Sequence, residues 1–293
     1  MSEGNTFRGR ILIASRRSAD TALRLEAVPE AAARAYERRV LSLLQGIEGN
    51  PCGKILLDAV VRAAAAHAVK IVAFRRAPGS RANATSIANK TGATPAGRVV
   101  HDWEGNPVLD PRFTDVVTGQ GLPLRGTGAG APVFVLFSPN DFGRCKLAAS
   151  QPDEVLFHEL VHAYRQLRGR FRRIALDGQY PNREELQATV LANIYVSSKS
   201  SGAPLRNQYA LPEAGKTWNV RDSGGRQKSG GLRNGYTHSE TVMLENLGAI
   251  AQLYEEERPL LQAINAIGCV FNPFREYAKK YGGGASVYHP ARH

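Results

Sequence analysis

The sequence has little cysteine. Its 293 residues include three, Cys52, Cys145 and Cys269, which are far apart. Three scattered cysteines are too few for a disulfide scaffold and do not have the spacing of a zinc ribbon. We therefore expect a protein of a reducing compartment whose stability comes from an apolar core, because 43% of the residues are hydrophobic. A catalytic thiol is not expected, since buried cysteine mostly acts as a small apolar residue.

Long apolar runs are also missing. The longest, residues 63–68, is interrupted by His67 and is far shorter than the roughly 20 residues of a membrane-spanning helix. Residues 1–17 are polar and basic apart from Ile11–Ala14, which is not the pattern of a cleavable signal peptide. We expect no membrane span, and any secretion would need a specialised system.

Acidic residues are outnumbered: 26 Asp and Glu stand against 38 Lys and Arg, a net charge of +12. Such a balance can attract nucleic acid, an acidic protein or an anionic membrane. The accompanying aromatic pattern or zinc-finger spacing of a nucleic-acid-binding protein is absent. Recruitment of an acidic protein substrate is the more economical hypothesis. The arginines form two clusters, Arg8, Arg10, Arg16 and Arg17, and Arg165, Arg168, Arg170, Arg172 and Arg173.

The most informative segment is Val155–Ala163, which contains His158-Glu159-Leu-Val-His162. Histidines four residues apart lie on one face of a helix. Two neutral imidazoles placed in this way can hold zinc, and Glu159 can take a proton from a water molecule at the metal. The flanking residues are apolar, so the helix is expected to be buried. The segment predicts a zinc peptidase with His158 and His162 as ligands; a core helix with hydrogen-bonded histidines is the alternative.

A catalytic zinc site needs a third protein ligand, and the predicted helix Asn182–Asn193 offers two candidates, Glu184 and Glu185. We favour Glu185, because the small Ala188 lies one turn further along the same face, where two helices must approach closely. Glu184 is the alternative. We expect the other glutamate to be a solvated carboxylate of the helix's first turn.

From about Gly53 to Ile194 the chain resembles the NleD-type effector zinc metallopeptidases of bacteria, peptidase family M91. The resemblance lies in a series of segments: Gly53–Leu57, Ile71–Phe74, Val133–Pro139, His158–His162 with the following Ala163-Tyr-Arg165, and Glu184–Ala188. After Val190 the chain departs from the family pattern, which leaves the substrate open.

The resemblance implies a zinc metalloendopeptidase with one Zn²⁺ ion that acts on a protein of a target cell as a secreted bacterial effector or toxin. Export would use a specialised system without a cleavable signal peptide, and the site of action would be the target-cell cytoplasm. The bacterial cytoplasm is the alternative location. A nucleic-acid-binding protein or a non-catalytic interaction protein that uses the basic surface is the alternative function.

The expected fold is α+β and zincin-like, with a small mixed or antiparallel sheet packed on the helix that carries His158 and His162, plus further helices. Residues 1–50 are predicted to be a partly flexible N-terminal extension with one amphipathic helix, and residues 51–293 the catalytic domain. Helices are expected over 54–67 and 239–257, and strands over 69–74 and 133–137. By analogy with zinc peptidases, an extended substrate is expected to add to the edge of strand 133–137.

A polar, glycine-rich stretch at about residues 198–235 is predicted to be a long loop, either a flap over the site or a floppy insertion. Tyr236 and His238 follow it. Either side chain is a candidate donor to the oxyanion that develops during hydrolysis. A structural role at the start of the next helix is the alternative for both. The sequence makes no prediction of the oligomeric state.

Overall fold

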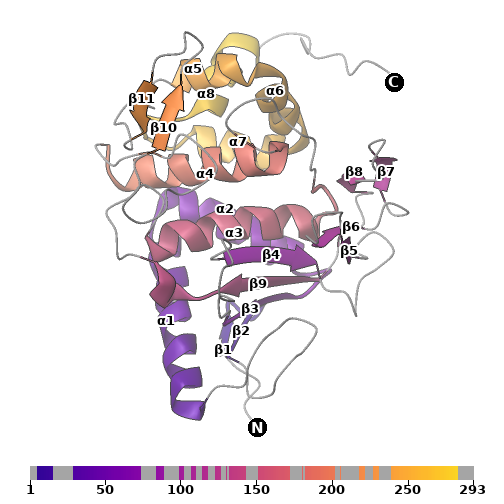
Figure 1. Ribbon diagram of the computed structural model, residues 1–293, viewed down its shortest axis with the longest axis vertical. Coiled ribbons are helices and arrows are strands. Elements are labelled where there is room, and N and C mark those ends of the chain that lie inside the picture. The colour runs from indigo at the N-terminus through magenta and orange to yellow at the C-terminus, as the bar shows by residue number, and fades with distance from the viewer. Residues whose placement is uncertain are drawn as a thin grey trace. The chain divides into compact units, whose positions relative to one another are not determined.

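Figure 1 shows the helices and the central sheet of the computed structural model. Contacts divide the chain into two compact units. The first comprises Met1–Lys146 and Ser150–Ala175, and the second Leu147–Ala149 and Leu176–His293. The described residues are 5–15, 29–73, 84–88, 99–101, 107–109, 114–117, 123–126, 130, 132–142, 151–171, 180, 182–201, 205, 218–221, 227–230 and 239–282.

A five-stranded mixed sheet forms the centre of the first unit, with the strand order β1-β2-β3-β9-β4. Strand β1 is antiparallel to β2, strands β2, β3 and β9 are mutually parallel, and β4 is antiparallel to β9. This confirms the predicted α+β class with a small mixed sheet. The bounds are Asn5–Phe7 for β1, Ile11–Ala14 for β2, Val69–Val72 for β3, Ala84–Ala88 for β4 and Val133–Phe137 for β9.

The core of the sheet is a row of apolar side chains that crosses its three parallel strands. Ile13 of β2 is aligned with Ile71 of β3, and Ile71 with Val135 of β9. All three side chains are fully buried. Parallel strands are usually covered on both faces and read as continuous apolar runs, which is why β3 and β9 are visible in the sequence.

The sequence does not predict strands β1, β2 and β4; the segment that forms β1 and β2 is short and largely polar. Arg8 and Gly9 both have positive φ, 51° and 64°, the geometry of a tight turn that matches strand twist. Glu37 of helix α1 (Glu30–Glu48) accepts hydrogen bonds from Asn5 Nδ2 (3.1 Å) and the backbone N–H of Ser15 (3.4 Å). Residues 5–15 are therefore tied into the first unit. The expected boundary at residue 50 stays a prediction, because compactness does not show which segment catalysis requires.

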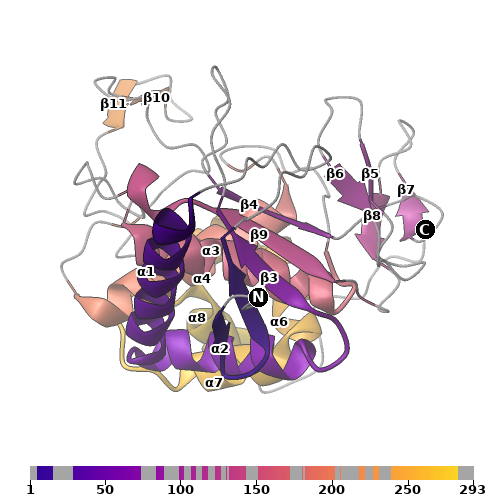
Figure 2. The same ribbon diagram turned by 90° about the horizontal axis from the view of Figure 1, so that it is seen from below.

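Helices α1 and α2 (Pro51–Ala63) are joined at a sharp corner. The Asn50 side chain caps α2 by accepting from the N–H groups of Cys52 (2.9 Å) and Gly53 (3.1 Å). A Cβ atom at Gly53 would lie 2.0 Å from the carbonyl oxygen of Ile47, so glycine permits this close approach. Figure 2 shows α1 beside the strands of the sheet, where it contacts β1 and β2.

Helix α3 (Pro152–Leu167) carries the two histidines and contacts strands β4 and β9 as well as helices α1 and α2. Its N-terminus is fixed by Pro152 and by a capping box, in which the side chains of Gln151 and Glu154 each bond the other residue's backbone. The prediction that the sheet packs on this helix is confirmed. The helix has almost no solvent-exposed face.

Strand β9 hydrogen-bonds on both sides, to β3 and to β4. The expectation that a substrate adds to the edge of strand 133–137 is therefore wrong, because a strand with two neighbours has no free edge. Strand β4 is the last strand of the sheet on this side.

Short elements complete the first unit. Two antiparallel pairs are present, β5 (Val99–His101) with β6 (Pro107–Leu109) and β7 (Thr114–Val117) with β8 (Pro123–Gly126). A single 3₁₀ turn, Pro139–Asp141, follows β9.

The second unit contains helix α4 (Arg183–Lys199), the antiparallel pair β10 (Trp218–Arg221) and β11 (Gln227–Gly230), and four further helices. The hairpin lies within the predicted polar loop, and most other residues of that stretch fall outside the described part of the chain. The further helices are α5 (Ser239–Glu245), α6 (Leu247–Glu256), α7 (Arg258–Asn265) and α8 (Pro273–Tyr281).

Hydrogen bonds from one short segment connect helices of this unit. The N–H of Phe271 donates to Ser197 Oγ of α4 (3.1 Å), and the N–H of Asn272 donates to Ser239 Oγ of α5 (2.8 Å). The single helix expected over 239–257 is wrong in one respect, because it is divided at Asn246. Asn246 has φ −125° and ψ 28°, outside the helical region, and its side chain donates to the carbonyl of Val242 (3.0 Å) alongside its own backbone N–H (3.2 Å).

The described helices include none with the length and apolar character that a membrane crossing requires.

Candidate metal centre

Helix α3 buries the three polar residues of its central motif. The side chains of His158, Glu159 and His162 are only 8%, 7% and 6% exposed. The surrounding Leu160, Val161 and Ala163 are buried as well, so apolar contacts hold the helix in place. As the spacing predicts, the two histidines lie one turn apart on one face.

The two imidazoles meet at their Nε2 atoms, which are 3.2 Å apart. The rings are close to perpendicular, with an interplanar angle of 79° and centroids 4.8 Å apart. A tetrahedral zinc ion with bonds of about 2.0–2.1 Å would separate two nitrogen ligands by about 3.3–3.4 Å. The spacing of the two nitrogen atoms therefore fits ligation of a single ion.

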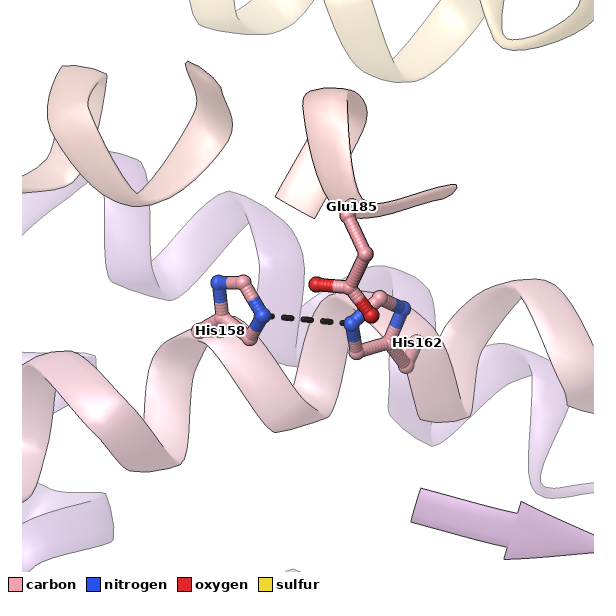
Figure 3. A group of neighbouring side chains, drawn as sticks. All are labelled: His158, His162 and Glu185. Atoms are coloured by element: carbon pink, nitrogen blue, oxygen red, sulfur yellow. Dashed lines mark hydrogen bonds between the residues drawn. The ribbon is translucent and has the colours of Figure 1, made fainter. Parts of the chain in front are cut away.

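A carboxylate joins these nitrogen atoms. One ligand atom from each of His158, His162 and Glu185 lies within 4.8 Å of the others, and Figure 3 shows the Glu185 side chain directed toward the two imidazoles. In the part of the chain that the structure describes, this is the one group of three such residues close enough to hold a metal. Two imidazole nitrogens and one carboxylate oxygen are a donor set that suits zinc.

Glu185 is positioned by the start of α4. The Asn182 side chain caps this helix by accepting a hydrogen bond from the N–H of Glu185 (3.1 Å). Capping fixes the first helical turn, and with it the direction of the Glu185 side chain. The side chain is half-buried, which leaves it accessible to a ligand.

Glu184 is placed differently from its neighbour. It is absent from the group of three, and its side chain is only 1% exposed. The expectation that the glutamate outside the metal group is solvated is therefore wrong for Glu184. Adjacent residues on a helix point about 100° apart, so one of them can face the histidines while the other is buried elsewhere.

Tyr236 and His238, the candidate oxyanion donors, lie outside the described residues. Their predicted roles stay predictions. The described chain resumes at Ser239, the first residue of α5.

The burial of Arg165 was not predicted, because the sequence places this residue in a cluster of arginines that suggests a basic surface. It is completely buried, and its guanidinium donates to the backbone carbonyl of Arg170. Arg165 therefore belongs to no surface cluster. Its position on a buried helix, three residues after His162, is the signal in the sequence that could have shown this.

Arg8 of the other arginine cluster is also engaged within the chain. Its guanidinium pairs with Glu48 at the end of α1 and with Asp58 on α2. These contacts raise the pKa of Arg8 and lower the pKa of Asp58, chiefly through their mutual hydrogen bond.

The fold and this group of residues define an α+β protein with a buried histidine pair and a carboxylate suited to a metal. A family model named Peptidase M91 and described as "Effector protein" matches residues 26–228. The chain belongs to this family. The match confirms the resemblance that the motifs of helices α3 and α4 carry, and it extends beyond the segment from Gly53 to Ile194.

Membership in this family makes the chain an effector of the peptidase class, whose substrate is a protein. It also indicates secretion and action in a host cell. Comparison with the curated proteins gives no match.

One solved structure aligns with the chain, that of the light chain of botulinum neurotoxin serotype HA. The alignment covers 83% of this chain and 74% of that chain at 13% identity, with a TM-score of 0.30. A score this low does not establish a common fold.

Proposed function

We propose that this protein is a zinc metalloendopeptidase with a zincin-like fold, in which His158, His162 and Glu185 hold one Zn²⁺ ion. The observation that carries the proposal is the 3.2 Å separation of the two buried Nε2 atoms, together with the Glu185 carboxylate within 4.8 Å. A mixed sheet in contact with the histidine helix supports the zincin-like fold.

Each side chain has a defined task in this proposal. The two imidazoles would hold the ion as neutral ligands, and the Glu185 carboxylate would supply a third bond and a negative charge. A zinc ion held in this way acts as a Lewis acid on a carbonyl group and makes water more acidic. Glu159 accepts the proton of the attacking water and passes it to the nitrogen of the departing amine. Tyr236 or His238 donates a hydrogen bond to the oxyanion.

The proposed substrate is an extended, acidic segment of a host-cell protein. Strand β4 is the last strand of the sheet and contacts α3, so a substrate strand could add to its backbone near the histidines. The net charge of +12 favours an acidic partner. Arg8 and Arg165 do not contribute to this attraction, because both are engaged within the chain.

The proposed setting follows from the family. The protein would be exported from a bacterium by a specialised system without a cleavable signal peptide and would act in the cytoplasm of the target cell. Residues 51–293 would form the catalytic domain.

The deciding experiment compares the wild-type protein with Glu159→Gln. The amide has nearly the same size but cannot accept the proton, so we expect zinc content to be retained and turnover to fall by about 10²- to 10⁴-fold. Both proteins are incubated with a target-cell lysate, and new amino termini are identified by mass spectrometry.

Asp153→Asn is the matched control, because it also neutralises one carboxylate of α3 but lies in the first turn of the helix. It should cleave the same substrates at the wild-type rate. Full activity of Glu159→Gln would remove Glu159 from the mechanism, and absence of any new amino termini with the wild type would count against a peptidase in that lysate.

A further inference from the structure

Helix α3 ends in a turn that reverses the chain directly beside the histidines. Gly169 has a φ of 61°, in the left-handed region that favours glycine. Its N–H donates to the carbonyl of Gln166 (3.0 Å), and the N–H of Arg170 donates to the carbonyl of Arg165 (2.9 Å). These two bonds are the Schellman termination of a helix.

The side chain of Arg165 strengthens the same turn. It is completely buried, and its guanidinium donates to the carbonyl of Arg170. Arg165 and Arg170 are thus joined twice, once by a backbone bond and once by a bond from a charged side chain. A buried charge is costly unless it is hydrogen-bonded, so this contact restricts where Arg170 lies.

Phe171, the next residue, contacts a metal-ligand candidate. Its ring centroid lies 6.1 Å from that of the His162 imidazole, and the planes form an angle of 61°. This is the edge-to-face arrangement in which aromatic pairs attract each other. The imidazole of His162 therefore has two ring neighbours, Phe171 and His158.

We propose that Phe171 is a positioning residue for His162, and that the turn formed by Arg165 and Gly169 sets Phe171 in place. Rotation of an imidazole about its Cβ–Cγ bond is only weakly restrained by the side chain itself. The Phe171 ring limits this rotation and keeps Nε2 of His162 directed at the shared metal position. A ligand oriented before binding loses less freedom when the ion binds. The inference rests on the proposed function, because it takes His162 as a zinc ligand.

Phe171→Ala in the full-length protein provides the test. Zinc affinity is measured with metal-free protein in competition with a chromogenic chelator. We expect the Kd for zinc to rise by about 2- to 12-fold, the equivalent of one aromatic pair. Phe171→Tyr keeps the ring and should stay within about twofold of the wild type.

Phe142→Ala is the matched control, since Phe142 stacks on Phe137 rather than on an imidazole, with centroids 5.7 Å apart. A Phe171→Ala protein that binds zinc as tightly as Phe142→Ala would overturn the proposal. Peptidase activity gives a second readout: the activity of Phe171→Ala should fall at limiting zinc and return at saturating zinc. A loss that saturating zinc does not restore would contradict a role in holding the metal.

Gly169→Ala tests the turn independently. Alanine disfavours the positive φ, so zinc affinity should fall in the same direction as for Phe171→Ala. The loss of zinc affinity in the double variant should be smaller than the sum of the two single losses, because both changes act through the Phe171 ring. Full additivity would contradict the proposal that the turn acts by placing Phe171. Phe171→Leu, which keeps apolar volume, replaces Phe171→Ala if the latter fails to fold.

Zinc binding by the wild-type protein distinguishes failure of this inference from failure of the proposed function. If wild-type protein binds no zinc through His158 and His162, the proposed function fails. If it does bind zinc and Phe171→Ala is unaffected, only the positioning role of Phe171 fails.

Discussion

Helices α1 and α3 lie in the same compact unit and have similar lengths, 19 and 16 residues, but they bury different kinds of side chain. Helix α1 buries one stripe, Ala33, Glu37, Val40, Leu44 and Ile47, and its other residues are half-buried or exposed. Helix α3 is buried nearly all round, and its buried residues include histidines, glutamates and an arginine. Helix α1 therefore stabilises the fold by apolar contact, whereas α3 holds polar groups away from water at an energetic cost. Such a cost is typical of a functional site.

The largest expected contrast, after the loss of turnover in Glu159→Gln, concerns zinc affinity. Glu185→Ala should raise the Kd for zinc by more than about 100-fold, because loss of a direct ligand should exceed the 10- to 100-fold effect of outer-shell changes. Glu184→Ala is the matched control and should leave the Kd nearly unchanged. Competition with a chelator measures both, and the reverse ranking would transfer the ligand role to Glu184.

Leu44→Ala should affect stability instead of metal binding. Leu44 of α1 is fully buried, and truncating such a side chain typically lowers the free energy of unfolding by about 2–5 kcal/mol. Urea unfolding of metal-free protein measures the loss, while the Kd for zinc of the folded fraction should match the wild type. A large change in that Kd would show that α1 and α3 do not have the separate roles described above.

The smallest expected effect involves the pairing of Asp58 with Arg8 and Lys54. The pKa of Asp58 is lowered, chiefly by its hydrogen bond with Arg8. A carboxyl with a lowered folded-state pKa stabilises the fold above its unfolded pKa of about 3.9, and this contribution is lost as the pH falls through the folded-state value.

Asp58→Asn should therefore lower the free energy of unfolding by about 0.2–1 kcal/mol at pH 7, as expected for a partly exposed ion pair. The difference from the wild type should shrink at an acid pH, as the pH falls through the folded-state pKa of Asp58. Urea unfolding at both pH values measures this change, and an equal difference at both would exclude the ionised carboxylate as its cause.

Local pattern predicted much of the fold. Helices α1 and α3 and strands β3 and β9 follow from helical spacing or from continuous apolar runs. Strands β1 and β2 could not be predicted in the same way, since among the described strands β1 pairs only with β2, and β2 pairs with β3, which lies more than 50 residues away along the chain. The 239–257 helix is divided at Asn246, whose backbone leaves the helical conformation, and hydrophobic periodicity does not record such a break.

In the candidate site, too, some features follow from local sequence pattern and others do not. The contact of Phe171 with His162 was not predicted, because it depends on the turn at Gly169. Burial of Arg165 was missed because the sequence places it in a run of arginines. A run of arginines in a sequence indicates charge but not exposure. The tertiary contacts of each side chain decide whether its charge faces solvent.

The sequence by itself determined that His158 and His162 share a helix face, because a separation of four residues corresponds to about one helical turn. It also indicated the peptidase family, through the motifs of helices α3 and α4. Only the tertiary structure decided that the Glu185 carboxylate, and not that of Glu184, lies with the two imidazoles. Spacing along a helix fixes the direction of a side chain relative to its own axis, but the meeting of residues from separate helices depends on how the chain packs between them.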